Sequence, residues 1–226
     1  MGTMIQYQRN GQKVSAYLAP PSGSGPFPAV IVIQEWWGLN AHIRDVADRY
    51  AKQGYVALAP DLYHGKVTDD PNEAGKLMGA LNRDDAIKDL VGGIQYLKSQ
   101  KTVQADRIGV TGFCMGGSFA LLLPCKTKEI KAAVPYYGEV PDAATLQALA
   151  SPVFYLYGDA DFWITRDDVR RLEDALKKFG KPGEVKIYPG APHGFFNDTR
   201  TDVYRTAEAQ DAWRRTLDFF AKHLKA

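Results

Sequence analysis

The chain has 226 residues, of which 45% are hydrophobic and 24% are charged, and its formal net charge is +2. This length predicts one compact domain over residues 1–226. The 28 basic and 26 acidic residues are interspersed, which argues against nucleic acid or a membrane surface as a partner. The apolar runs are too short to span a bilayer and the N-terminus lacks a secretory signal pattern, so we predict a cytoplasmic protein.

The first elements read as strands joined by tight turns and one helix. Residues 4–8 and 14–19 flank Asn10-Gly11, a dipeptide typical of a two-residue hairpin turn. The β-branched run over 27–34 predicts a central parallel strand that is covered on both faces. A helix over 41–54 and a strand over 55–63 follow.

The remaining elements alternate between strand and helix. Residues 64–82 have no clear period and are predicted to be irregular, and they lead into a helix over 83–100. Strands are then expected at 107–112, 130–138, 152–161 and 184–190, with helices at 115–123, 141–150, 166–180 and 204–225. A hairpin followed by six strand–helix units predicts an α/β fold, with a mostly parallel central sheet and helices on both faces.

A cysteine, an aspartate and a histidine each follow a predicted strand. Cys114 lies in the sequence GFCMGG, and Asp161 and His193 come after the next suitable strands. Because ligands bind beyond the carboxyl ends of parallel strands, these side chains are expected to meet at one edge of the sheet. The frame Gly-x-Cys-x-Gly and the order nucleophile, acid, histidine are those of a nucleophile elbow and its catalytic triad.

Other readings of these residues remain open. Free cysteine is among the most buried residue types, so Cys114 could be structural, as we expect for Cys125. The two cysteines are too far apart along one helix to form a disulfide. Glu139 competes with Asp161 as the partner of His193, whereas Asp159 is suited to closing its own turn.

Glu35 ends an apolar run and is predicted to be partly buried near Cys114. A negative charge there disfavours the thiolate and keeps the thiol neutral at rest. The alternative is a structural carboxylate paired with a cation such as Arg44. The backbone N–H groups of Met115 and Trp36 are expected to face a developing oxyanion.

The chain resembles the dienelactone hydrolase family in stretches spread over nearly its whole length: QEWWGLN, YVALAPDLY, GVTGFCMGG, YGDAD and PHGFFND. The resemblance implies an α/β-hydrolase fold in which Cys114 is the nucleophile, Asp161 the acid and His193 the base. It implies that Glu35 holds the thiol and activates it when substrate enters. It also implies that neither a metal nor another cofactor is needed.

The chain departs from the family pattern at the substrate pocket. Pro71 and Gly75 stand where the family has an arginine and a tyrosine, and Asn197 stands where a second arginine is expected. The cations that hold the dienelactone carboxylate are therefore absent, with Arg83 and Arg200 as candidate substitutes. The residues expected to line the pocket are Trp37, His64, Tyr137, Phe195 and Asn197.

These observations predict a monomeric hydrolase of small carboxylic esters or lactones. A Cys-His-Asp triad would form an acyl-thioester on Cys114, and water would then release the acid. The alternative is a non-catalytic scaffold that binds an acyl ligand or senses oxidants through Cys114.

Overall fold

A single eight-stranded sheet runs through the protein in the computed structural model, which describes residues 1–226. The strand order is β1-β2-β4-β3-β5-β6-β7-β8. β1 and β2 form an antiparallel hairpin, β2 pairs antiparallel with β4, and the pairs from β4 to β8 are parallel. The strands are β1 Thr3–Arg9, β2 Gln12–Ala19, β3 Phe27–Ile33, β4 Val56–Pro60, β5 Val103–Phe113, β6 Ala132–Tyr136, β7 Val153–Gly158 and β8 Gly183–Tyr188.

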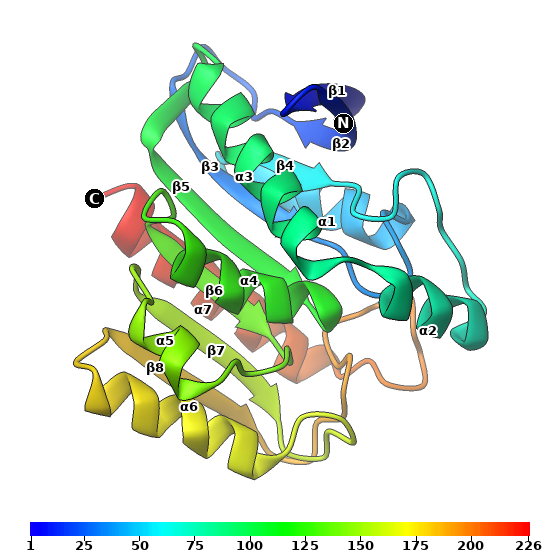
Figure 1. Cartoon of the computed structure of the whole chain (residues 1–226), viewed down its shortest axis with the longest axis vertical. Helices are drawn as coiled ribbons and strands as arrows, with labels where there is room; N and C mark the ends of the chain where they lie inside the picture. Colours follow the sequence, from blue (N-terminus) through cyan, green and yellow to red (C-terminus); the bar gives the residue numbers. More distant parts are fainter.

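Helices cover both faces of the sheet, as predicted (Figure 1). α1 and α7 pack into one buried cluster, and α3, α4, α5 and α6 pack into another on the opposite face. No helix combines the length and the apolar character needed to cross a membrane. The helices are α1 Ala41–Lys52, α2 Pro71–Ala80, α3 Arg83–Ser99, α4 Met115–Lys126, α5 Ala143–Gln147, α6 Arg166–Lys178 and α7 Thr206–Leu224.

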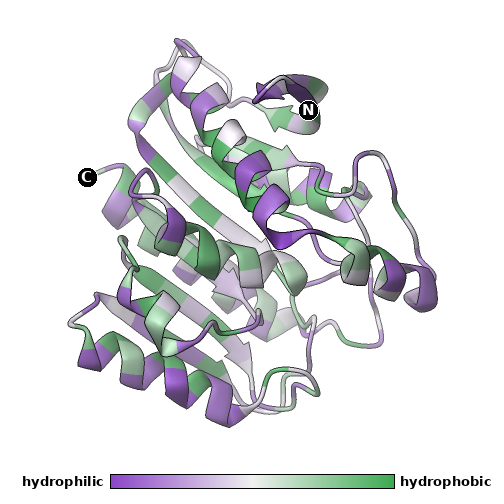
Figure 2. Cartoon of the chain, viewed as in Figure 1, coloured by the Kyte–Doolittle hydropathy of each residue, from purple (hydrophilic) through white to green (hydrophobic).

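The core explains why β3 lies in the middle of the sheet. Ile31 and Ile33 belong to the cluster on one face, whereas Val30 and Val32 belong to the cluster on the other. Alternate side chains of a strand point to opposite faces, so a strand that is apolar throughout is stable only where both faces are covered. Burial of each such side chain stabilises the fold by about 1.5–3 kcal/mol. Figure 2 shows hydrophobic central strands beneath helices whose outer faces are hydrophilic.

The first hairpin has the predicted turn. Asn10 and Gly11 have φ values of 48° and 83°. A two-residue type I′ turn needs a positive φ at both positions, and Asn-Gly is the sequence that adopts it most readily. The prediction for this turn is confirmed.

The prediction of an irregular segment over 64–82 was wrong, because α2 lies within it. The side chain of Asp70 caps α2 by accepting hydrogen bonds from the backbone N–H groups of Asn72 and Glu73, and Pro71 begins the helix. Ala74 is the only fully buried residue of α2. The helix therefore lacks the apolar stripe on which the sequence reading relied, although its Asp-Pro start is a recognised helix signal.

Candidate active site

Cys114 occupies a strained corner between β5 and α4. Its φ of 56° and ψ of −119° lie in a region that residues with a side chain rarely adopt. Only glycines fit on either side: a Cβ added to Gly112 would lie 2.1 Å from the carbonyl oxygen of Gly116, and one added to Gly116 would lie 2.4 Å from that of Ile33. The tight frame therefore holds the cysteine at the carboxyl edge of the sheet, where a nucleophile elbow presents its side chain.

His193 and Asp161 form a hydrogen-bonded pair at the same edge. Nδ1 of His193 lies 2.7 Å from Oδ2 of Asp161, whose side chain is completely buried. Oδ1 of Asp161 accepts hydrogen bonds from the backbone N–H groups of Trp163 and Ile164, at 2.7 and 2.9 Å. The carboxylate is therefore fixed in place and directs a proton to Nδ1, which leaves Nε2 of the ring available for chemistry.

The two competing carboxylates have other partners. Oδ1 of Asp159 accepts a hydrogen bond from the backbone N–H of Gly190 at 2.6 Å, which closes the turn as expected. Glu139 forms an ion pair with Arg83. Neither carboxylate is hydrogen-bonded to the histidine, so Asp161 is the acid that pairs with His193.

Glu35 is buried directly after β3 and does not pair with Arg44. Its Oε2 accepts a hydrogen bond from Nδ2 of Asn197 at 2.6 Å, whereas Arg44 donates to the backbone oxygen of Asn40. The structural pairing considered as an alternative is therefore wrong. Burial raises the pKa of Glu35 to about 7, although the hydrogen bond from Asn197 opposes this shift.

The surroundings of Cys114 hold its thiol in the neutral form. Burial is the largest cause that raises the pKa of Cys114, and the charge of Glu35 raises it further. The backbone N–H groups of Met115 and Trp36 act in the opposite direction, because they favour the charged thiolate. Both N–H groups therefore lie beside the sulfur, where an oxyanion hole requires its donors.

These groups line one cavity of about 260 Å³. Glu35, Cys114 and His193 lie in its wall, and Trp37 and Asn197 lie there as well, as expected from the sequence. The wall also includes Trp36, Met78, Phe162, Trp163, Gly194, Arg200 and Val203. The cavity therefore combines a few polar groups with mainly apolar and aromatic walls, as is usual for small-molecule sites.

Two residues predicted to line the pocket lie behind it instead. Tyr137 and Phe195 are completely buried. The ring centre of Tyr137 lies 5.0 Å from that of His193, and Phe195 packs against Tyr137 at 5.5 Å. The large apolar rings at these positions fill the core beneath the catalytic histidine candidate, so they support the pocket wall without facing the cavity.

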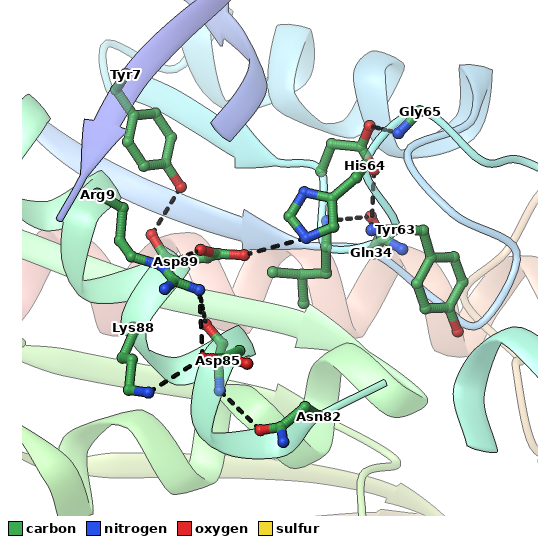
Figure 3. Close-up of polar contacts among 12 residues, drawn as sticks. Tyr7, Arg9, Gln34, Tyr63, His64, Gly65, Asn82, Asp85, Lys88 and Asp89 are labelled. Atoms are coloured by element: carbon green, nitrogen blue, oxygen red, sulfur yellow. Dashed lines mark hydrogen bonds and ion pairs between the residues drawn. The ribbon is translucent and has the colours of Figure 1, made fainter. Parts of the chain in front are cut away.

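The prediction for His64 was wrong, because this residue lies outside the cavity. Its side chain is 60% exposed, and Nε2 lies 3.7 Å from Oδ2 of Asp89. Figure 3 shows His64 beside Asp89, which also binds Arg9 through a 2.7 Å hydrogen bond. His64 has a φ of 52°, in the turn between the end of β4 and α2.

The sequence reading missed part of the aromatic wall. Phe162 and Trp163 follow Asp161 directly, so their closeness in sequence to the predicted acid could have indicated that they line the cavity. Met78 was missed together with α2. Of the two candidate cations, Arg200 lines the cavity with its guanidinium 5.5 Å from the Trp37 ring, whereas Arg83 does not.

No part of the chain brings together three His, Cys, Asp or Glu side chains that could hold a metal ion. Both cysteines are free. The groups present at the site are a thiol, an imidazole, two carboxylates and two backbone N–H groups.

Comparison with known proteins places the chain in a family. A family model described as "Dienelactone hydrolase family" matches residues 14–224. Protein usf of Aquifex pyrophilus is 39% identical, with 99% of this chain and 100% of the relative covered. A protein of Aquifex aeolicus named "Putative carboxymethylenebutenolidase" is 34% identical, with both chains fully covered.

A solved structure from Klebsiella pneumoniae, described as a "Putative Dienelactone Hydrolase", superposes with a TM-score of 0.91. It is 32% identical in sequence, and 98% of each chain is covered. The fold predicted from the sequence, that of the α/β-hydrolases, is thereby confirmed. With this overall likeness and a family match over nearly all of its length, the chain belongs to the dienelactone hydrolase family.

Proposed function

We propose that the protein hydrolyses small carboxylic esters or lactones with a triad of Cys114, His193 and Asp161. The observation that carries this proposal is the convergence of the elbow cysteine and the 2.7 Å His193–Asp161 pair on one cavity. Two backbone N–H donors beside the sulfur complete the set of groups that acyl transfer requires. No metal or cofactor is needed for this chemistry.

In the first half of the reaction, Sγ of Cys114 attacks the carbonyl carbon and its proton passes to Nε2 of His193. A carbon–sulfur bond forms, and the bond to the alcohol oxygen breaks. The alcohol leaves with the proton that His193 held. In the second half, His193 takes a proton from water, whose oxygen attacks the thioester carbon, and the proton returns to the sulfur as the acid is released.

The backbone N–H groups of Trp36 and Met115 stabilise the negative oxygen in both halves. At rest these groups act on the sulfur of Cys114. A bound carbonyl oxygen accepts hydrogen bonds from these N–H groups while the sulfur attacks the carbonyl carbon. Loss of one such donor typically costs about 2.7–4 kcal/mol of barrier, so their placement is a large part of the catalysis.

Glu35 keeps the thiol of Cys114 protonated before substrate binds. Its charge lies near the sulfur and disfavours the thiolate, so the free enzyme keeps a thiol that reacts slowly with other electrophiles. Transfer of the proton to His193 then accompanies substrate attack. We propose this role for Glu35 and a positioning role for Asn197, which holds the carboxylate at 2.6 Å.

The charges around the cavity favour uncharged substrates. Arg200 is the only Lys or Arg side chain in its wall. Nε and Nη2 of this guanidinium donate hydrogen bonds to the carboxylate of Asp202, at 2.9 and 2.6 Å. A substrate carboxylate would compete with that pair and would lie near Glu35, so we propose esters and lactones without a free carboxylate.

The competing hypothesis of an oxidant sensor has weaker support. Sensor cysteines are exposed and have a low pKa. Here the side chain is buried, and its pKa is raised above the usual value. A hydrogen-bonded His193–Asp161 pair also has no purpose in a pure sensor.

The decisive experiment is turnover of p-nitrophenyl acetate by the wild-type chain and by Cys114→Ala. We expect steady turnover that disappears in Cys114→Ala and persists in the matched control Cys125→Ala, since Cys125 lies on the same helix outside the cavity. Mass spectrometry of the wild-type chain quenched with acid during turnover would detect the acyl group on Cys114. Full activity in Cys114→Ala would refute the proposal.

A further inference from the structure

A second, smaller cavity adjoins the catalytic one. Its volume is about 110 Å³, and Met78 and Trp163 line both cavities. Only these two residues are shared, so the two cavities meet at Met78 and Trp163. We propose that the second cavity is an acyl-chain site, which receives the apolar chain of an ester substrate while its carbonyl group lies at Cys114.

The walls of the second cavity suit a hydrocarbon chain. Leu81, Phe119 and Leu122 supply apolar surface from the end of α2 and from α4. The charged groups in the wall, Arg83 and Glu139, are paired with each other. A chain that enters from the catalytic cavity therefore meets apolar side chains and no unpaired charge, which is the environment that favours burial of methylene groups.

The position of His193 decides which half of the ester enters this cavity. The leaving alcohol must lie within reach of Nε2, because His193 donates its proton to it. His193 lines the first cavity and does not line the second. The alcohol therefore stays in the first cavity, and the chain that points away from the histidine is the acyl chain.

Met115 links the two cavities along this path. Its backbone N–H lowers the pKa of Cys114, and Met115 is also one of the residues that line the second cavity. The sulfur of Met115 accepts a hydrogen bond from the hydroxyl of Tyr63 at 3.2 Å, which fixes the side chain. An acyl group whose carbonyl oxygen binds the Met115 N–H therefore lies next to a residue that lines the second cavity.

This inference rests on the proposed ester hydrolysis, and a series of p-nitrophenyl esters tests it. Acetate, butyrate and hexanoate share one leaving group and differ only in the acyl chain. We expect kcat/KM to rise with chain length in the wild type. In Leu122→Trp, which fills the second cavity, we expect kcat/KM to fall about tenfold for hexanoate and less than about twofold for acetate.

The matched control is Leu217→Trp, a similar half-buried leucine on α7, which packs on the opposite face of the sheet. It should keep the wild-type preference for long chains. An equal loss for acetate and hexanoate in Leu122→Trp, or an unchanged chain-length profile, would overturn the acyl-chain site. Either result would leave ester hydrolysis itself standing.

A binding measurement tests the site without turnover. The chain has four methionines, so methyl-labelled methionine gives four NMR signals. With hexanamide, a neutral acyl compound, we expect shifts at Met78 and Met115 and none at Met1 and Met4, which are exposed near the N-terminus. Because Met115 lines only the second cavity, an unmoved Met115 signal at saturating hexanamide would contradict the proposal.

Discussion

The charge of Glu35 should control how fast the thiol of Cys114 reacts with an alkylating reagent. Glu35 has a pKa of about 7, so it is charged above that pH and neutral below it. Its charge raises the pKa of Cys114. In Glu35→Gln we therefore expect faster alkylation of Cys114 by iodoacetamide above neutral pH, by roughly tenfold for each unit by which the thiol pKa falls.

The wild-type and Glu35→Gln rates should converge as the pH falls below about 7, where the wild-type carboxyl is also neutral. Peptide mapping separates Cys114 from Cys125, whose rate serves as the internal control. Parallel profiles for the two proteins over the whole pH range would show that Glu35 does not restrain the thiol.

The same carboxylate makes the fold less stable at high pH. The folded-state pKa of about 7 lies above the ordinary 4.5, so the folded chain keeps this proton while the unfolded chain loses it. Stability is therefore lost as the pH rises through that window, by about 3 kcal/mol in total. Glu35→Gln should lack this loss, and urea unfolding of both proteins at about pH 4 and about pH 8 measures the difference. If the difference in unfolding free energy between the wild type and Glu35→Gln is the same at both pH values, the pKa of Glu35 is not raised.

Most of the chemistry at the site could be predicted from the sequence. Cys114, Asp161 and His193 each follow a strand, and parallel strands bring their carboxyl ends to one edge whatever the loops do. The cavity wall was harder to predict. Tyr137 and Phe195 are large aromatic residues like those of the cavity wall, but they are completely buried. The sequence does not show whether such a ring faces the cavity or the core behind it.

At the scale of the elements, the elbow depends on close backbone contacts. Gly116→Ala would place its new Cβ 2.4 Å from the oxygen of Ile33 and 2.5 Å from that of Gln34. Because both atoms belong to backbone, β3 or α4 has to move. We expect a loss of several kcal/mol in the free energy of unfolding, together with loss of esterase activity.

Gly79→Ala is the matched control for this substitution. Gly79 lies inside α2, and a Cβ added there has nothing within 4 Å. Alanine is favoured over glycine within a helix by roughly 0.5–1 kcal/mol, so this variant should be slightly more stable than the wild type. If Gly116→Ala unfolds at the same denaturant concentration as Gly79→Ala, the close contact at the elbow is not as tight as described.

The elements themselves follow from local sequence where a period is strong. The run in β3 and the turn at Asn10-Gly11 leave one reasonable structure each. α2 was not predicted because most of its residues are exposed, so its sequence has no apolar stripe. Its only clear signals are the Asp70 cap and Pro71, which lie in the two positions that begin a helix.

At the scale of the whole molecule, the surface area is that expected of one compact chain. The accessible area is 10180 Å², and a monomer of 25.0 kDa is expected to expose about 10,200 Å². The exposed large hydrophobic side chains are few: Met1, Met4, Val67 and Phe162. Without a large apolar patch to bury, the chain should sediment as a single species near 25.0 kDa. A dimer that persists on dilution would contradict this expectation.

The pairing of β3 with β5 positions the groups for the reaction, whereas other elements determine which substrates fit. Ile33 and Gly112 are register partners on these two strands, and each of the two N–H donors, Trp36 and Met115, lies three residues further along the chain. The spacing of the donors is therefore set by the ladder of the sheet. Met78, by contrast, reaches the crevice from a helix with little buried surface. Insertions or replacements in α2 can thus redirect the protein to new substrates while the reaction itself is inherited unchanged, which gives this scaffold a low barrier to functional diversification.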